Sequence, residues 1–400
     1  MKSEIDTMVA KKGNITWLSY LVVDIHLHTT RALEIMRHME GRGYRNTLIA
    51  TRSAKNLLGT NKNRHLILIP IRYRSFISSI VFALAVLLYL PIHLVVSKPK
   101  YVIVSADVSV FGTIPYALLA KVFKTKFVLD IRSTPVDTPG LSGSFRKLVI
   151  HVSVLIAKRL FGGLTIITSL MREELCSSYK INPSEVGVWT SGVCSNSFNP
   201  EKYVISGNEL KQKLGLGGKF VVFYHGVLRD NRGITTTGEA IRLLRQKHPD
   251  IVLFLLGSPR YPELDELLHK EDLHENIIIH TPVAYEEVPR FVSFSDLCIV
   301  PLPNLYRWRF QSPLKLLEYL AMEKVVIVSN IPAHSEVIGT EACGIYLQSV
   351  NPFEIAKSIA YAYSNKNSLA DWGKSGRLIV QKNYTWERVA GELESYLISI

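Results

Sequence analysis

Short apolar runs alternate with longer amphipathic stretches along almost the whole chain. In the first half, runs rich in β-branched and aromatic residues predict buried strands, and apolar residues spaced three or four apart predict helices between them. The strands are expected at 15–23, 100–106, 126–131, 164–168 and 186–189, and the helices at about 116–123, after a loop at 133–143 as far as 161, and at 170–179. This alternation is typical of an α/β protein with parallel sheets.

The second half shows the same alternation but no repeated sequence. Strands are expected at 219–224, 251–257, 276–280, 297–300 and 324–330, with a loop at 331–339, and helices at 234–247, 261–272 and 386–400. A length of 400 residues suggests two or three domains. Residues 194–218 are interpreted as a connection. We therefore expect a first domain at 1–195, a second at 196–380, and a closing helix at 381–400.

One apolar run is long enough to cross a bilayer. No residue from 76 to 96 carries a fixed charge, and basic residues lie on both sides of the run. Pro91 interrupts it, the two basic flanks give no orientation signal, and the strands before and after it are expected to pair in one sheet. We therefore expect a helix lying in or against the membrane surface, with its stem on the sheet. The alternatives are an ordinary buried helix and a true anchor or re-entrant segment.

The positive charge of the chain is concentrated in its first half. Residues 1–200 hold 25 Lys and Arg against 11 Asp and Glu (+14), whereas residues 201–400 hold 22 against 23 (−1). A basic face indicates an anionic partner, either membrane lipid or a lipid diphosphate. There is no zinc-site spacing and no aromatic–basic RNA motif, so no nucleic-acid partner is expected.

Cysteine usage points to a reducing compartment. Cys176, Cys194, Cys298 and Cys343 are far apart and lack metal-site spacing, which fits reduced thiols better than a disulfide framework. The first apolar run, at 15–23, is interpreted as a strand and not as a signal peptide. We expect a cytoplasmic protein, peripheral on the inner face of the cell membrane.

The segment at 311–321 (QSPLKLLEYLA) carries the clearest candidate chemistry. Ser312 suits the N-cap of a helix and Pro313 its first position. The N–H groups from Leu314 onward then lack partners inside the helix and sit at the positive end of its dipole, where a diphosphate binds well. Lys315 is expected to help hold the phosphate, or else to pair with Glu318. A carboxylate at Glu318 can accept hydrogen bonds from both hydroxyls of a ribose.

Residues 312–339 (SPLKLLEYLAMEKVVIVSNIPAHSEVIG) resemble the nucleotide-binding block of the retaining glycosyltransferases with the GT-B fold, of the family 4 type ("glycosyl transferases group 1"). The nearest group builds cell-surface glycans in bacteria and archaea. The similarity covers most of the chain and is strongest from 221 to 344. It implies an α/β fold in which two Rossmann-like domains face each other across a deep cleft. It also implies that a C-terminal helix crosses back to the first domain.

The resemblance extends to the loop after the strand at 219–224. Gly226 begins the loop that contacts phosphate in the family, whose usual form has an Arg directly after this Gly. Here Val227 replaces that Arg, Arg232 fills the usual Lys position, and Arg229 is expected to compensate. The alternative for both arginines is a solvated loop charge. Phe310 stands where many relatives have a glutamate that contacts the sugar.

Four residues of the first domain are candidates for the acceptor side of the cleft. His28 and Thr29 fall in the expected loop after strand one, where relatives often have a Gly-Gly pair. Asp130 and Arg132 resemble a D/E-x-R signature that ends the corresponding strand in surface-glycan transferases. The alternatives are a structural role for His28 and an internal ion pair for Asp130 and Arg132.

The resemblance implies transfer of a sugar from a nucleoside diphosphate donor, a UDP-sugar before a GDP-sugar, to a lipid-linked or other glycan acceptor with retention. Arg232, Lys315 and the helix start would stabilise the leaving diphosphate, and His28 would contact donor or acceptor. No DxD-like pair follows a strand, so neither a metal nor any other cofactor is expected. The alternatives are a sugar-nucleotide epimerase and a membrane-bound module that binds sugar nucleotides without catalysis.

Overall fold

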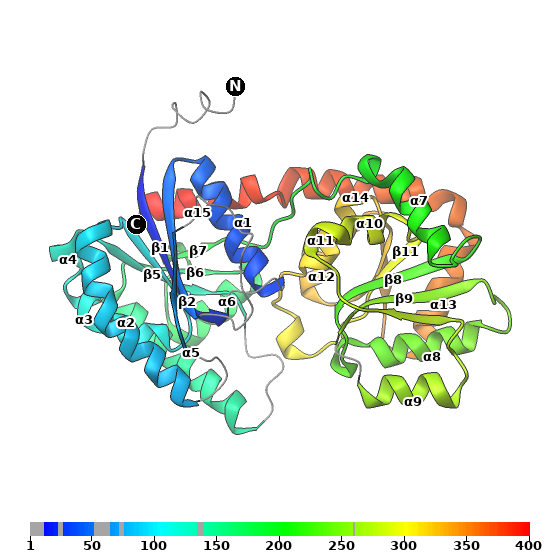
Figure 1. Ribbon diagram of the computed structural model, residues 1–400, viewed down its shortest axis with the longest axis horizontal. Coiled ribbons are helices and arrows are strands. Elements are labelled where there is room, and N and C mark those ends of the chain that lie inside the picture. Colours follow the sequence, from blue (N-terminus) through cyan, green and yellow to red (C-terminus); the bar gives the residue numbers. More distant parts are fainter. Residues whose placement is uncertain (1–11, 23–26, 52–64, 72–75, 134–139, 259–260) are drawn as a thin grey trace. The chain divides into compact units, whose positions relative to one another are not determined.

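The computed structural model describes residues 12–22, 27–51, 65–71, 76–133, 140–258 and 261–400 (Figure 1). The chain forms two compact units. The first comprises residues 1–190 together with 386–400, and the second comprises residues 191–385. The unit boundaries thus lie five residues from the expected ones, after Thr190 and after Thr385.

The first unit is built on a seven-stranded parallel sheet in the order β3-β2-β1-β4-β5-β6-β7. Most of its described strand residues are buried, as in parallel sheets covered on both faces. Two strands, β2 and β3, had no counterpart among the expected elements. The strands are β1 Gly13–Val22, β2 Tyr44–Thr51, β3 His65–Ile69, β4 Tyr101–Ser105, β5 Lys126–Ile131, β6 Gly163–Ile166 and β7 Val186–Val188.

Helices connect the consecutive strands of this sheet, apart from β2 and β3, which are joined by residues outside the described part of the chain. The apolar run forms a single helix, α2, that continues through Pro91, so this proline does not interrupt it. The expected helix around 116–123 is divided into α3 and a short α4. The helices are α1 Leu27–Gly41, α2 Phe76–Ser97, α3 Ser109–Leu118, α4 Ala120–Phe123, α5 Leu141–Leu160 and α6 Ser169–Tyr179.

The C-terminal helix α15 (Trp386–Ser399) belongs to the first unit, as the resemblance implied. The Glu394 carboxylate accepts hydrogen bonds from Lys12 Nζ at 2.7 Å and from Arg42 Nε at 2.6 Å. On the opposite side of the helix, Tyr396 Oη donates to the carbonyl of Glu185 at 2.8 Å. These contacts hold α15 beside α1 and β7.

The second unit has a six-stranded parallel sheet in the order β10-β9-β8-β11-β12-β13. Its first strand, β8, lies in the middle of the sheet, between β9 and β11. The strand order reverses between β8 and β11. Ligands of such sheets bind beyond the carboxyl ends of the strands at this reversal. The strands are β8 Phe220–Val227, β9 Ile251–Ser258, β10 Ile277–His280, β11 Leu297–Val300, β12 Val326–Ser329 and β13 Gly344–Leu347.

Two expectations for the second unit were wrong. Residues 331–339 are not a loop, because Pro332 begins helix α12 and Ile331 takes the extended conformation of a cap. The expected connection at 194–218 contains a helix, α7. The helices are α7 Val204–Lys213, α8 Ile234–Leu244, α9 Pro262–Lys270, α10 Val288–Ser293, α11 Leu314–Ala321, α12 Pro332–Ile338, α13 Pro352–Ser364 and α14 Leu369–Asn383.

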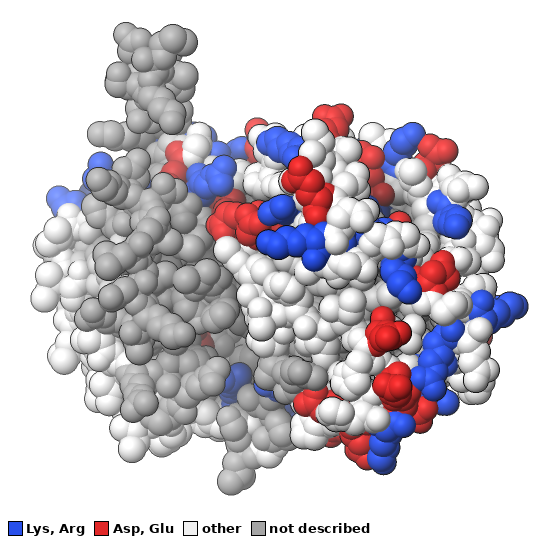
Figure 2. All heavy atoms as spheres, turned by 45° about the vertical axis from the view of Figure 1, so that its right-hand side comes forward, with Lys and Arg blue, Asp and Glu red and all other residues white. Residues whose placement is uncertain are grey.

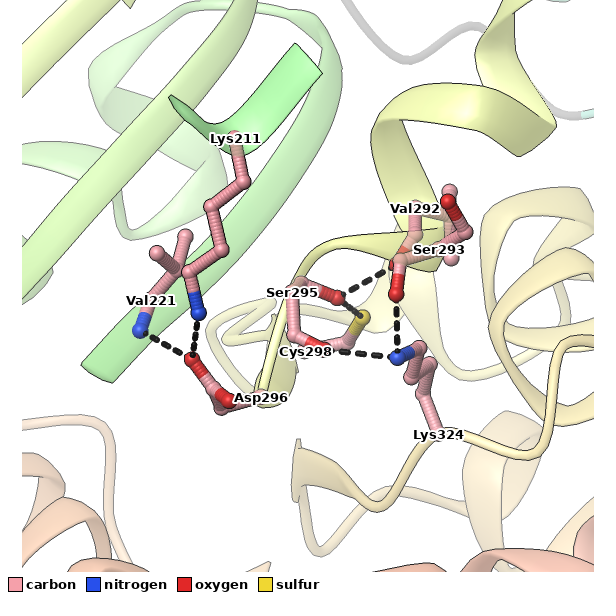
Figure 3. Close-up of polar contacts among 8 residues, drawn as sticks. All are labelled: Lys211, Val221, Val292, Ser293, Ser295, Asp296, Cys298 and Lys324. Atoms are coloured by element: carbon pink, nitrogen blue, oxygen red, sulfur yellow. Dashed lines mark hydrogen bonds and ion pairs between the residues drawn. The ribbon is translucent and has the colours of Figure 1, made fainter. Parts of the chain in front are cut away.

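Polar contacts fix the start of β11 beside β8 (Figure 3). Asp296 Oδ2 accepts hydrogen bonds from the Val221 N–H at 2.7 Å and from Lys211 Nζ at 3.0 Å. Lys324 Nζ donates to the carbonyls of Ser293 and Ser295, at 2.8 and 2.6 Å. These contacts hold together the amino ends of β8 and β11, the two strands at the reversal of strand order.

Candidate functional site

The candidate site of the second unit lies after β8 and at the start of α11. Along the chain these segments are about 80 residues apart, but β8 and β11 are neighbours in the sheet and α11 follows β11. Gly226 stands near the end of β8 with a φ of 119°, a backbone conformation that residues other than glycine rarely adopt. A Cβ at this position would lie 3.2 Å from Lys315 Nζ, so the loop and α11 are in close contact.

The start of α11 differs from the expectation by one residue. Pro313 is the N-cap, in an extended conformation, and Leu314 is the first helical residue. Ser312 does not cap the helix with its side chain, because its buried Oγ accepts a hydrogen bond from the Ser191 N–H at 3.0 Å. The N–H of Leu316 bonds to the Pro313 carbonyl. The N–H groups of Leu314 and Lys315 come before it, at the end of the helix where backbone N–H groups are available to a ligand.

The ammonium group of Lys315 is enclosed by Tyr224 and the glycine of β8. Its Nζ donates to Tyr224 Oη at 2.7 Å and lies 4.0 Å from the centroid of that ring. Burial, and secondly the Arg232 guanidinium, hold the pKa of Lys315 well below its usual value, while Glu318 opposes the shift. At the position of Lys315, a positive charge is therefore destabilised, and a nearby negative charge would stabilise it.

Arg232 supplies the second positive group. It ends the short helix Asp230–Arg232, directly before Gly233, whose φ of 72° turns the chain into α8. Its guanidinium carbon lies 4.9 Å from the centroid of the Trp308 ring, which holds the side chain in place. Arg229 also lies in this loop and is exposed.

Glu318 is completely buried, at 0 % exposure, and belongs to a polar network. Its Oε2 bonds to His225 Nε2 at 2.9 Å, and its Oε1 accepts from Tyr285 Oη at 2.7 Å. His225 Nδ1 bonds in turn to Tyr319 Oη at 2.9 Å. The carboxylate is therefore oriented from several sides, and it is not one half of a surface ion pair with Lys315.

Several residues of this site were not found from the sequence. Tyr224 and His225 precede Gly226 in the loop motif but carry no signal of their own. Trp308 and Tyr285 come from distant segments whose patterns do not point to the site. Only the fold shows that they contact Arg232 and Glu318.

In the first unit, the expected loop after strand one is shorter than predicted. Helix α1 begins at Leu27, so His28 and Thr29 lie in its first turn and not in a loop. Their side chains lie outside the described residues. The backbone still places both at the carboxyl end of β1, the strand at the reversal of this sheet.

Asp130 and Arg132 meet around Trp189. Asp130 Oδ1 accepts hydrogen bonds from Thr165 Oγ1 at 2.8 Å and from Trp189 Nε1 at 3.1 Å, and burial raises the pKa of its carboxyl. Arg132 donates to the carbonyls of Trp189 and Thr190, and its guanidinium carbon lies 3.4 Å from the Trp189 ring centroid. Burial lowers the pKa of Arg132 to about 10. Both side chains thus fix the segment by which the chain leaves the first unit.

Comparison with known proteins identifies the second unit. The family model for glycosyl transferases group 1 matches residues 206–379. The second unit belongs to this family. The family match spans all the residues of the second-unit site discussed above except Ser191, from Tyr224 to Tyr319.

The relatives that this chain matches are distant in sequence. Spore coat protein SA of Bacillus subtilis is 24 % identical over 57 % of the chain, and the match spans 63 % of that protein's length, a little under two thirds. A glycosyltransferase from Rickettsia africae superimposes with a TM-score of 0.74 at 17 % identity, over 97 % of this chain and 98 % of the other. Anabaena HepE in complex with UDP and glucose superimposes with a TM-score of 0.74 at 13 % identity, over 96 % of this chain and 99 % of the other. The chain therefore has the GT-B fold.

Proposed function

We propose that this chain moves a sugar from a nucleoside diphosphate donor to a lipid-linked glycan acceptor in the synthesis of cell-surface polysaccharide. The donor is a UDP-sugar in preference to a GDP-sugar, the anomeric configuration is retained, and no metal ion takes part. The observation that carries the proposal is the pair of positive side chains Lys315, at the start of α11, and Arg232, in the loop after β8. Repulsion from the Arg232 guanidinium helps to lower the pKa of Lys315.

A diphosphate relieves this repulsion. Two positive groups and the N–H groups at the start of α11 match the two negative charges of a bound diphosphate. During transfer the glycosidic bond breaks and further negative charge develops on the leaving diphosphate. Groups that are already in position stabilise that charge without reorganising. Arg232 and Lys315 are thus the proposed catalytic groups, and Gly226, Arg229, Ser312, Pro313 and Leu314 complete the proposed diphosphate site.

The nucleoside is assigned to Glu318. Its carboxylate is buried and oriented by His225 and Tyr285, so it is prepared to accept hydrogen bonds from ribose hydroxyls. Each carboxylate oxygen has two lone pairs, so the hydrogen bonds from His225 and Tyr285 leave acceptor capacity for ribose hydroxyls. The preference for UDP is supported by HepE, which shares the fold and was crystallised with UDP and glucose.

The acceptor is assigned to the first unit. His28 and Thr29 lie at the carboxyl end of β1, where ligands of such sheets bind. His28 is proposed to contact the reacting groups. Asp130 and Arg132 act on the same side by holding the segment around Trp189.

Calorimetric titration with UDP tests the donor site. Loss of a charged hydrogen-bond partner costs about 1.5–3 kcal/mol, so Glu318→Gln and Arg232→Ala should each weaken binding by roughly 10- to 150-fold. Glu341→Gln and Arg242→Ala, which lie outside the site, serve as matched controls. Unchanged affinity in both site variants would show the assignment to be wrong.

Nucleotide release separates the proposed transferase from its two competitors. A transferase releases UDP from a UDP-sugar only when lipid-linked acceptor is present. An epimerase would convert the sugar nucleotide without any acceptor, and a binding module would leave it unchanged under both conditions.

A further inference from the structure

Helix α2 has two apolar faces instead of one. Its inner face is buried in the first unit through residues such as Phe82, Val86 and Leu90. Its outer face is also apolar, yet it is open to solvent. Nine large apolar side chains on α2 are each at least 44 % exposed: Phe76, Ile77, Ile80, Val81, Leu84, Leu88, Ile92, Val95 and Val96. A soluble helix would carry polar side chains on this outer face.

The exposed apolar surface continues onto neighbouring helices. Figure 1 shows α2 and α3 side by side, and Tyr116 of α3 donates a hydrogen bond to the Leu87 carbonyl of α2. At the other end of α2, Phe76 contacts Phe145 of α5, with ring centroids 5.2 Å apart. Exposed apolar side chains on these helices and on α4 are Phe111, Leu118, Leu119, Val122 and Leu148. Together with the nine residues of α2 they form what we call the α2–α5 face.

Positive charges accompany this face. Lys98 follows the exposed end of α2, and Lys121 and Lys124 flank Val122 on α4. Within the described residues from 76 to 160, the acidic side chains Asp107 and Asp130 are both held in hydrogen bonds inside the unit. By contrast, basic and acidic side chains intermingle on the view of the second unit in Figure 2.

Helix α2 is anchored to the sheet at both ends. Near its start, Ser78 Oγ bonds to Tyr20 Oη of β1 at 2.6 Å. At its end, the carbonyl of Ser97 accepts a hydrogen bond from Asn14 of β1. Although α2 is long and apolar enough to span a bilayer, it therefore lies along the sheet over its whole length, about 33 Å at 1.5 Å per residue.

We propose that the α2–α5 face docks on the anionic surface of a lipid bilayer, with α2 lying in the membrane plane and its outer side chains inserted among the lipids. A broad apolar face accompanied by lysines matches the interfacial region of an anionic membrane, where apolar side chains enter the acyl boundary and cations meet headgroups. The exposed side chains are aliphatic for the most part and the charges are of one sign. Such a surface suits lipids better than it suits a protein partner with its own polar pattern. The inference does not depend on the proposed glycosyl transfer, since it concerns binding alone.

Sedimentation with vesicles tests the proposal. The wild-type protein should bind phosphatidylglycerol-containing vesicles more tightly than phosphatidylcholine vesicles, and added salt should weaken this binding without abolishing it. The triple variant Leu88→Gln, Ile92→Gln and Val96→Gln should lose the salt-resistant part. A control triple variant of exposed apolar residues in the second unit, Ile205→Gln, Phe353→Gln and Leu378→Gln, should bind as the wild type does.

The lysines are tested separately. Each positive charge removed near an anionic surface should lower binding at low salt about five-fold. Lys121→Gln with Lys124→Gln should therefore lower it about 25-fold and leave the salt-resistant part, whereas Lys357→Gln with Lys382→Gln on the second unit should have no effect.

A fluorescent probe gives a second measurement that does not depend on how well the triple variant folds. An environment-sensitive dye on Leu88→Cys, with Cys194→Ser to remove the most accessible of the native thiols, should shift to the blue on adding anionic vesicles. The same dye on Leu378→Cys should not shift. Three results would overturn the proposal: no sedimentation at low salt, equal binding by the two triple variants, or equal dye shifts at Leu88→Cys and Leu378→Cys when vesicles are added.

Discussion

Replacing Lys315 by methionine should separate stability from nucleotide binding. The free protein holds this ammonium group in a poorly solvated place beside Arg232, and the pKa of Lys315 is accordingly well below its usual value. Methionine keeps the length of the side chain and removes the charge. Tyr224 Oη loses one donor but still donates to the Val227 carbonyl at 3.1 Å. We therefore expect Lys315→Met to melt no lower than the wild type at pH 7.

The same change should weaken UDP binding by roughly 10- to 150-fold, since a charged partner of the diphosphate is lost at about 1.5–3 kcal/mol. Binding should also depend on pH in a defined direction. A bound diphosphate raises the pKa of Lys315, so the wild type takes up a proton on binding and its affinity falls as pH rises above the pKa of the free protein. Calorimetry in buffers of different ionisation enthalpy measures this uptake, which Lys315→Met should abolish.

Stability depends on pH with a sign that can be stated in advance. Because folding lowers the pKa of Lys315, the unfolded chain binds more protons in the pH range between the two pKa values. The free energy of unfolding therefore increases as pH rises through that range. This gain should be absent in Lys315→Met.

Lys324 provides a matched control for Lys315. It is also a lysine whose pKa is lowered by burial, but its ammonium group bonds to two backbone carbonyls at the start of β11 (Figure 3). Lys324→Met leaves both carbonyls without this donor, at about 2–4 kcal/mol. That corresponds to a loss of roughly 5–15 °C in Tm for a unit of this size. The reasoning is refuted if Lys315→Met lowers Tm as much as Lys324→Met, or if both variants bind UDP like the wild type.

Three further predictions concern metal dependence and the first unit. Sugar transfer should continue in excess chelator because Lys315, Arg232 and the start of α11 supply the positive charge; a rate recovered only with magnesium or manganese would contradict this. Gly187→Ala should destabilise the first unit by about 1–3 kcal/mol, because the new Cβ would overlap the Tyr396 ring. The control Gly41→Ala should leave stability unchanged, because its Cβ would meet no atom within 4 Å. Hydrogen exchange of α15 measures the difference between the two variants. Burial raises the pKa of Asp107 from 3.8 to about 6, so its contribution to stability is complete below pH 3.8 and lost as pH rises through 6. Thermal melts of Asp107→Asn from pH 4 to 7 should therefore lose that dependence relative to the wild type, and a constant difference in Tm would count against it.

Much of the fold could be predicted because its strands are buried on both faces and appear as continuous apolar runs. The strand at 219–224 and the one at 324–330 were found for this reason, as β8 and β12. The strands β2 and β3 were not predicted, although β2 has eight residues and the four-residue β11 was found. Helix α12 within 331–339 was not predicted because it has only seven residues, although Pro332 is well suited to the first position of a helix.

The candidate site could be predicted only where it is local in sequence. Lys315 and Glu318 share one helix, and the roles proposed for them follow from its spacing. The contact of Glu318 with His225 joins residues 93 positions apart, and no periodicity reports it. Such contacts depend on which strands become neighbours, which is a property of the sheet order and not of either segment alone.

The start of α11 shows how a local interpretation and a tertiary contact can conflict. If Ser312 capped the helix, its Oγ would accept one of the leading N–H groups that the diphosphate needs. In the structure this Oγ instead accepts the N–H of Ser191, and Pro313, which has no side-chain acceptor, stands at the cap. The leading N–H groups of α11 are thereby kept for a ligand. A helix start that lacks a side-chain cap costs some stability, and in this protein the lowered pKa of Lys315 lies two residues after the cap position Pro313. Both are expected of a site that becomes stable only when an anion occupies it.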